Sequence, residues 1–399
     1  MTTTNLSIIP TALSHIGGLC LSEGITPVWY NVMRKRFAPL SEDSQDIPQL
    51  SSIGHTESAS DLFVHLSRTL EDDHVTAFIT TDSVAKAFDI SHEPSRGSTG
   101  ATPLSSPFIE VQIPGKRTGL VASKDIRAGD AIISEKPAMV VHEGIDETDE
   151  ENRLRLQWEA VRQLPREIST RLLNLLAYGD GDILDEILNT NSFGVTIPDS
   201  ADHRAVFLQI SRLNHACRPN AAYQFDPETL VQTIYAIDDI PPGEEITISY
   251  IDTLVPYTQR QNDLANWGFE CTCQLCSLAP EDRVRSDRNI QSILTYKRAL
   301  DDWSEYSAAT TEMAEALIEL VRSELTHDAI ATAYRLAAYE FNAVGHKDGA
   351  LEYAFRAFTH GCAIWRKRDA ESNIHDVVRI MSAPEKHWTW MKRIGTCVA

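Results

Sequence analysis

The chain has 399 residues, of which 42% are hydrophobic and 23% charged, and a formal net charge of −21. The composition is typical of a soluble globular protein, and the length predicts two or three domains. The negative charge disfavours direct nucleic-acid binding and would attract a basic protein or peptide, although on charge alone the simpler interpretation is that acidity keeps the protein soluble.

No run of about 18 or more apolar residues occurs, so we expect no transmembrane helix and no membrane partner. Residues 1–22 carry no charged side chain, but they lack the basic start and compact apolar block of a secretory signal. We therefore expect an intracellular protein, in the nucleus, the cytoplasm or both, because Arg34-Lys35-Arg36 is too short to be a targeting signal.

The N-terminal part of the chain contains two polar stretches, residues 41–60 and 91–107, whose Ser, Gly, Pro and acidic residues predict linkers. Short helices are predicted between them, over residues 61–70 and 82–88. We therefore expect residues 1–106 to form a partly disordered N-terminal extension.

From residue 108 the chain changes to short β-rich runs separated by Gly, Pro and Asp, which predicts strands joined by tight turns. The predicted strands cover residues 108–111, 119–122, 131–134, 138–141, 206–210, 221–225, 230–236 and 245–249. Leu, Trp, Val and Ile at helical spacing over residues 154–188 interrupt them, after an acidic run over residues 143–151. The fold class is therefore α+β, with a helical insertion between groups of strands.

After residue 276 apolar residues recur at three- and four-residue spacing. Helices are predicted over residues 300–325, 328–344 and 350–365. The last two have the alanine and aromatic content of a tetratricopeptide-like hairpin around a turn at residues 345–349. We expect residues 280–399 to form an all-α C-terminal domain where a protein partner could dock.

Three closely spaced cysteines, Cys271, Cys273 and Cys276, predict a metal site rather than disulfides. A closed structural zinc site takes four ligands in a tetrahedron. Cys217 is the best candidate for the fourth, because it lies in the other conspicuous loop, residues 214–220. The alternative is that these are buried free thiols of a reduced protein.

A zinc ion shared by those two loops would have a mechanical role. It would tie the segment that carries Trp267 and Phe269 to the loop that carries Asn214. A pocket with aromatic walls and amide groups would result, and such a pocket suits a purine ring.

Four segments of the chain resemble the signatures of SET-domain methyltransferases. NHACRPN (214–220) resembles NHSCxPN, GEEITISY (243–250) resembles GEELTxxY, and CTCQLC (271–276) resembles the post-SET CxCxxC. Upstream, GKRTGLVASKDIRAGDAII resembles the first SET segment with its glycine turn. The resemblance spans residues 108–277, and the helical insertion and helical C-terminus make the SMYD-like branch and its fungal relatives the nearest match.

The resemblance implies a SET-type fold of small β-sheets over residues 107–279, with the helical insertion at about 142–190 and a post-SET zinc loop at 267–277. It implies that S-adenosylmethionine donates a methyl group to the lysine ε-amine of a protein, histone or other. The MYND zinc finger of SMYD-type proteins is missing, since no cysteine lies between Cys20 and Cys217.

The resemblance also implies individual roles. Tyr250 matches the active-site tyrosine, and Phe193 matches a phenylalanine of the substrate channel, whose apolar wall would lower the pKa of the substrate lysine by desolvation. The implied cofactor-binding residues are Lys116, Arg117, Thr118, Asn214, His215, Tyr250, Trp267 and Phe269. The implied zinc ligands are Cys217, Cys271, Cys273 and Cys276.

Two other functions fit the same motifs. In one, the SET fold survives as a catalytically inactive scaffold or interaction protein, which Arg117 favours because the family usually has glycine there. In the other, the chain is a small-molecule methyltransferase with a widened channel. Intact Asn214, Tyr250 and all four cysteines favour an enzyme over a scaffold.

Overall fold

The structure is a computed structural model that describes residues 62–68, 74–90, 106–197, 202–364 and 367–394. The linker predicted over residues 41–60, nearly all of the linker over 91–107 and most of the N-terminal extension lie outside these residues. Among the helices that are described, none is long and apolar enough to cross a membrane.

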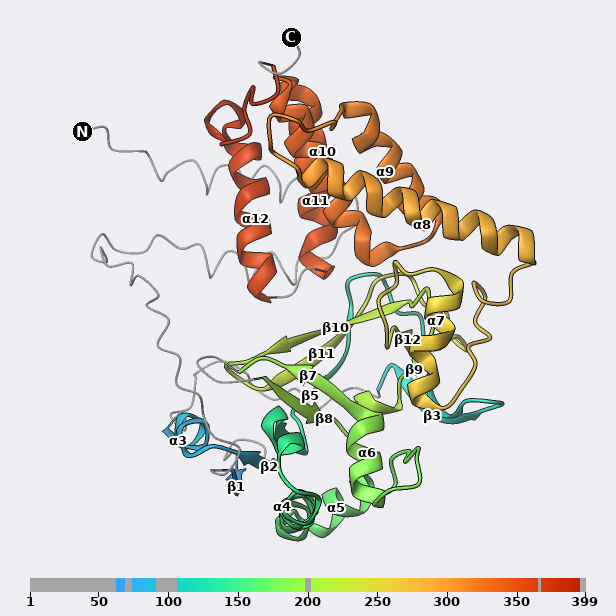
Figure 1. Cartoon of the computed structure of the whole chain (residues 1–399), viewed down its shortest axis with the longest axis vertical. Coiled ribbons are helices and arrows are strands. Elements are labelled where there is room, and N and C mark those ends of the chain that lie inside the picture. Colours follow the sequence, from blue (N-terminus) through green and yellow to red (C-terminus); the bar gives the residue numbers. More distant parts are fainter. Residues whose placement is uncertain (1–61, 69–73, 91–105, 198–201, 365–366, 395–399) are drawn as a thin grey trace. The chain divides into compact units, whose positions relative to one another are not determined.

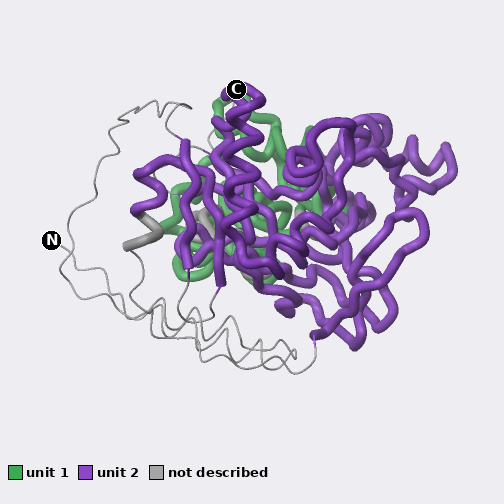
Figure 2. Tube along the Cα trace, turned by 90° about the horizontal axis from the view of Figure 1, so that it is seen from below, with its two compact units in different colours: residues 1–55, 295–319, 329–399 green, residues 56–294, 320–328 purple. Residues whose placement is uncertain are grey.

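The described residues divide into two compact units, shown in Figure 2. One unit takes in the described parts of residues 56–294 and 320–328. The other takes in those of residues 295–319 and 329–399. The predicted domain boundaries at residues 107 and 280 stay predictions.

A five-stranded sheet in the first unit has the order β1-β2-β6-β8-β7. Its strands are β1 (Phe63–Arg68), β2 (Val75–Thr80), β6 (Met139–His142), β7 (Ser192–Val195) and β8 (His203–Val206). Only the β2–β6 pair is parallel. This sheet therefore combines strands from both sides of the predicted boundary at residue 107.

The helix predicted over residues 61–70 is wrong, because β1 occupies residues 63–68. Each of its six residues pairs with one of β2 in an antiparallel register from Phe63↔Thr80 to Arg68↔Val75. All six residues of β2 are buried, so this strand offers β1 a fixed edge. Pairing with a distant segment thus overrides the weak local preference for helix. The helix expected at residues 82–88 does form, as α3 (Asp82–Ile90).

Both faces of the sheet are buried at its central strands β2, β6 and β8, since alternate residues of a strand point to opposite faces. Ala77 and Ile79 lie in one core with residues of the helical insertion, whereas Phe78 lies in the core shared with the smaller sheets. The insertion follows the short η2 (Glu143–Glu147) and consists of α4 (Glu150–Gln163), α5 (Arg166–Leu173) and α6 (Ile183–Asn191). Figure 1 shows these helices grouped beside the sheet.

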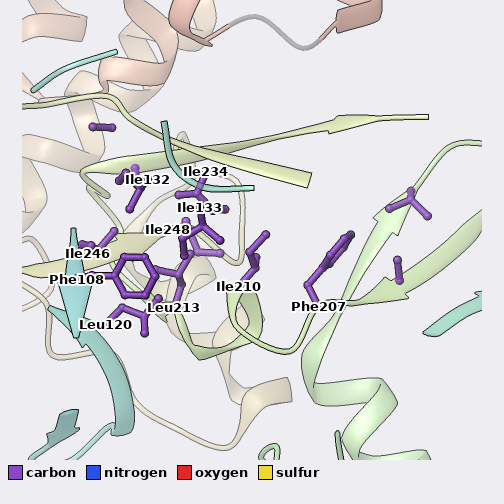
Figure 3. Close-up of a cluster of buried hydrophobic side chains, with 14 of the residues drawn as sticks. Phe108, Leu120, Ile132, Ile133, Phe207, Ile210, Leu213, Ile234, Ile246 and Ile248 are labelled. Carbon is purple, nitrogen blue, oxygen red and sulfur yellow. The ribbon is translucent and has the colours of Figure 1, made fainter. Parts of the chain in front are cut away.

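Two smaller sheets complete the mixed α+β fold. One has the order β3-β4-β12-β9, with bounds Phe108–Ile113, Arg117–Ala122, Glu245–Ile248 and Asn214–His215. The other has the order β10-β11-β5, with bounds Ala221–Asp226, Val231–Ala236 and Ala131–Glu135. Side chains from both sheets meet in the core of Figure 3, where Leu120 and Ile246 lie near Ile133 and Ile234.

The strand predicted over residues 206–210 stops at Val206, and the chain turns into the short 3-10 helix η3 (Ile210–Arg212). The reason is a buried carboxylate, which the sequence pattern does not reveal. Glu135 accepts hydrogen bonds from the backbone N–H groups of Gln209 and Ile210, at 3.0 and 2.9 Å. This capping ends the strand and directs the chain toward β9.

From residue 257 onward the elements of the described chain are helices, joined by turns and loops. They are α7 (Tyr257–Leu264), η4 (Ala265–Trp267), α8 (Pro280–Asp301), α9 (Thr311–Ser323), α10 (His327–Ala343), α11 (Lys347–Ile364), α12 (Lys367–Ser382) and η5 (Pro384–Lys386). The single helix predicted over residues 300–325 is interrupted between α8 and α9. In the predicted hairpin, Tyr334 of α10 stacks on Tyr353 of α11 with ring centroids 6.3 Å apart.

Candidate functional site

The loop of residues 214–220 and the strand β12 are joined into one structural element. β9 pairs with β12 in parallel, with Asn214 opposite Thr247 and His215 opposite Ile248. The side chain of Asn220 accepts a 2.9 Å hydrogen bond from the Thr247 backbone N–H and donates another of 2.9 Å to the Glu245 carbonyl. Two of the segments singled out in the sequence therefore support each other directly.

The four predicted metal ligands lie together. The Sγ atom of Cys217 is 3.9 Å from that of Cys271 and 3.6 Å from that of Cys276, and all four sulfurs including Cys273 lie within 4.8 Å of one another. A zinc ion with Zn–S bonds of about 2.3 Å would need tetrahedral S···S distances of roughly 3.8 Å. The cluster therefore has the dimensions and the ligand chemistry of a closed zinc site.

The thiols of this cluster influence one another strongly. Hydrogen bonds with Cys217, Cys271 and Cys276 lower the pKa of Cys273, and hydrogen bonds with Cys271, Cys273 and Cys276 raise the pKa of Cys217. Four thiolates held this close would repel one another, and a divalent cation would offset that negative charge.

His215 connects the cysteine cluster to Tyr250. Its Nδ1 accepts a 3.0 Å hydrogen bond from the Tyr250 backbone N–H, so the ring proton is on Nε2, which lies 3.2 Å from the Cys217 sulfur. Burial lowers the pKa of His215 to about 4, which keeps the ring neutral. The imidazole can thus donate to the Cys217 sulfur, as outer supports of metal-binding ligands do.

Aromatic rings gather beside the cysteines. The Tyr250 ring centroid is 5.4 Å from that of Trp267 and 6.5 Å from that of Phe269. The indole N–H of Trp267 donates to the carbonyl oxygen of Thr190 in α6, at 3.1 Å. The helical insertion therefore fixes a ring of the cysteine-rich segment, a contact that the sequence did not suggest.

The phenol of Tyr250 is a hydrogen-bond donor in this structure. It donates to the carbonyl oxygen of Leu213 at 2.6 Å. Burial, with a smaller effect from Glu245, raises the pKa of Tyr250 above its usual range, so the hydroxyl stays protonated at neutral pH. Tyr250 can orient a polar group but is not a ready base.

Several polar residues surround Glu245. This residue lies in the GEEITISY segment, and the sequence patterns predict no role for it. Its carboxylate accepts hydrogen bonds from Lys116 Nζ at 2.7 Å and from Asn214 Nδ2 at 2.9 Å. Asn214 also approaches the Thr118 carbonyl at 3.4 Å. Three of the predicted cofactor residues are thereby brought together around one acidic side chain.

Arg117 and Phe193 are the remaining predicted site residues. Arg117 is exposed and has a φ of 65°, a left-handed conformation that favours glycine. Phe193 lies on β7, with its ring centroid 5.9 Å from Phe207 and 5.3 Å from Tyr223. Tyr250 packs against both this core and the cysteine cluster, so it alone of the predicted residues bridges the two.

Residues 117–251 match the family described as SET domain. The chain carries a SET domain. The matched segment is about a third of the chain, and it includes Arg117, Thr118, Phe193, Asn214, His215, Cys217 and Tyr250. The predicted resemblance to SET proteins is confirmed.

Sequence relatives of this chain come from fungi, animals and plants. The chain is 31% identical over 193 residues to "Histone-lysine N-methyltransferase set5" of Schizosaccharomyces pombe, covering 48% of this chain and 57% of the relative. It is 31% identical to human "N-lysine methyltransferase SMYD2" over 34% of this chain and 32% of the relative. It is 40% identical to "Histone-lysine N-methyltransferase ATXR2" of Arabidopsis thaliana over 22% of this chain and 19% of the relative. The chain thus spans little more than half of the first relative's length and a third or less of the other two.

Proposed function

We propose that this chain is an S-adenosylmethionine-dependent methyltransferase that modifies a lysine ε-amine of a protein. The SET domain and the names of the relatives support this activity. The observation that carries the proposal is the junction at Tyr250, which packs against both the core of Phe193 and the cysteine cluster. That position is where a cofactor site and a lysine channel would have to meet.

The residues near Tyr250 fit S-adenosylmethionine chemically. The rings of Tyr250, Trp267 and Phe269 offer stacking surfaces for an adenine. Lys116 and Glu245 offer opposite charges for the carboxylate and ammonium of the methionine end. We propose Lys116, Arg117, Thr118, Asn214, His215, Tyr250, Trp267 and Phe269 as the cofactor-binding residues, with Arg117 contributing through its main chain.

We propose that residues 267–277 form a post-SET loop whose Cys271, Cys273 and Cys276 bind structural zinc together with Cys217. The S···S distances around Cys217 support a tetrahedral site. The ion would hold Trp267 and Phe269 beside the segment of Asn214 and His215. Its role would be to keep the cofactor site closed.

When bound, S-adenosylmethionine supplies a methyl group on an electrophilic sulfonium. The protein's part is to position a neutral amine, because an unperturbed lysine has a pKa of about 10.4. Phe193 and its aromatic neighbours would disfavour the charged ammonium by desolvating it. The hydroxyl of Tyr250 donates to the Leu213 carbonyl, so its oxygen would accept from an N–H of the amine and orient it. We expect this positioning to be the larger contribution to the rate.

The substrate we propose is a histone or another basic protein with an accessible lysine, since the net charge of −21 would attract it. A histone substrate would place the protein in the nucleus. We further propose that the C-terminal helices form a tetratricopeptide-like region that binds a protein partner. The stacking of Tyr334 on Tyr353 supports a helical hairpin, which a tetratricopeptide-like region requires.

The first test is calorimetric binding of S-adenosylmethionine to the zinc-loaded full chain, with Asn214→Ala and Tyr250→Phe alongside. We expect binding in the parent, loss in Asn214→Ala and retention in Tyr250→Phe. Methyl transfer from labelled cofactor to core histones should then occur with the parent and fall in Tyr250→Phe. Absence of cofactor binding at millimolar concentration would overturn the enzymatic function.

One observation favours an inactive scaffold as the second candidate. The left-handed backbone at Arg117 favours glycine over arginine, and this turn is proposed to contact the cofactor. A scaffold would bind no S-adenosylmethionine yet keep its zinc. Measuring zinc content in the same preparation separates this outcome from a misfolded sample.

A further inference from the structure

The loop that carries Asn214 and Cys217 is held by a residue well beyond the matched SET segment. Glu324 directly follows α9 and pairs with Arg218 of the loop, with 3.3 Å between Glu324 Oε2 and Arg218 Nη2. The two side chains are only 6% and 11% exposed. Glu324 and Arg218 belong to the same compact unit.

Arg218 uses its guanidinium to join three separate stretches of backbone. Its Nη1 donates to the carbonyl oxygens of Cys217 at 2.8 Å and Thr253 at 2.9 Å. Its Nε donates to the carbonyl oxygen of Glu324. One side chain therefore fixes the backbone of a proposed zinc ligand to the segment after Tyr250 and to the end of α9.

The end of α9 is built to receive this arginine. Leu325 adopts a left-handed φ of 52°, and the N–H of Thr326 bonds back to the Val321 carbonyl at 3.1 Å, which terminates the helix. The Glu324 carbonyl is left pointing out of the helix, where its partial negative charge favours a cation. Arg218 is that cation.

The carboxylate of Glu324 is itself held from α8. Ser286 Oγ donates to Oε2 at 2.6 Å, and Asn289 Nδ2 donates to Oε1 at 2.7 Å. Both oxygens thus have partners besides Arg218, so the carboxylate has little freedom to move. The chain of contacts runs from α8 through Glu324 and Arg218 to the backbone of Cys217.

We propose that Glu324 is a positioning residue for the loop of residues 214–220. This proposal rests on the proposed function, in which the loop holds the cofactor and zinc. Glu324 acts through Arg218, because a buried guanidinium that loses its carboxylate partner must move toward water or find another acceptor. Either change releases the Cys217 carbonyl. The start of α8 and the end of α9, both beyond the matched segment, thus take part in shaping the site.

The test compares Glu324→Gln with a matched variant, Glu340→Gln, in the full chain. Glu340 also belongs to a buried ion pair, with Arg393 at 2.7 Å and exposures of 1% and 9%, but it lies in the other compact unit. Both changes remove one buried charge, so both should lower the melting temperature. Hydrogen exchange followed by mass spectrometry then reports on the loop itself.

We expect amides in peptides covering residues 213–222 to exchange about tenfold faster in Glu324→Gln and at the parent rate in Glu340→Gln. Ser286→Ala and Asn289→Ala should cause smaller increases of the same kind, which keeps the test decisive if Glu324→Gln does not fold. Equal exchange in the parent and all three variants around Glu324 would overturn the proposal. So would an equal increase in Glu340→Gln.

Calorimetry with S-adenosylmethionine adds a second readout. The dissociation constant should rise about tenfold in Glu324→Gln and stay unchanged in Glu340→Gln. If the parent binds no S-adenosylmethionine, the proposed function fails while the exchange measurement still decides the role of Glu324. If the parent binds and the two variants bind equally well, the positioning role fails and the proposed function stands.

Discussion

Gly119 and Asn214 touch so closely that position 119 has no room for a side chain. A Cβ atom built on Gly119 would stand 2.6 Å from Nδ2 of Asn214 and 2.4 Å from Cδ1 of Ile113. Both distances are far shorter than van der Waals contact. The glycine therefore lets β4 approach the amide that is proposed to hold the cofactor.

Gly119→Ala should displace Asn214 and Ile113. Overpacking of this kind costs about 1–3 kcal/mol, and a loss of about 1.4 kcal/mol in binding would weaken S-adenosylmethionine about tenfold. Urea unfolding and calorimetry measure the two effects. Gly194→Ala is the control, because a Cβ atom at Gly194 meets nothing within 4 Å. Similar losses in both variants would show that Gly119 has no special role.

Arg117→Gly and Arg117→Val should change stability in opposite ways. A β-branched residue strongly resists the φ of 65° found at position 117, whereas glycine adopts it freely. We expect the glycine variant to be at least as stable as the parent and the valine variant to lose about 1 kcal/mol or more. Urea denaturation at neutral pH tests this. A valine variant as stable as the glycine variant would contradict a left-handed turn.

Purified protein should contain one zinc ion per chain. Cys217→Ser should bind far less zinc, because serine supplies no thiolate to the tetrahedral site. Ser277→Ala changes a neighbour of the cluster and keeps all four sulfurs, so it should bind zinc normally. Metal analysis by atomic emission gives the stoichiometry, and chelation should lower the melting temperature of the parent. Full zinc content in Cys217→Ser would refute the four-cysteine site.

Glu135 should make stability fall as the pH rises from about 4 to 7. Burial raises the pKa of Glu135 in the folded chain, so the folded state holds this proton more tightly than the unfolded state. The resulting stabilisation is complete below the unfolded pKa of about 4.3 and is lost as pH rises through the folded value.

Glu135→Gln removes this titration while keeping one oxygen for the N–H groups of Gln209 and Ile210. The free energy of unfolding of the parent minus that of Glu135→Gln should therefore decrease across the range. Urea titrations at four pH values between 4 and 7 measure it. A difference that grows with pH would show that the carboxylate, not the acid, is favoured by folding.

Several features were predictable from local patterns. Alternating apolar residues and turn signals marked β4, β10 and β11, and three- and four-residue spacing marked α10 and α11. The helix prediction at β1 failed because the residues of β1 become a strand by pairing with β2, and a local pattern does not contain that pairing. Glu135 likewise ends β8 through a contact that no local pattern contains.

The sequence by itself determined the resemblance to SET domains and pointed to the cysteine cluster, because residue type and close spacing are enough to mark both. Only the tertiary structure decided which groups act together. Glu245 accepts hydrogen bonds from Lys116 and Asn214, and Trp267 donates one to Thr190. Each of these contacts joins segments that are far apart in the sequence. Such contacts depend on how sheets and helices pack, and packing is a property of the whole unit. The support of Arg218 by Glu324 has the same origin.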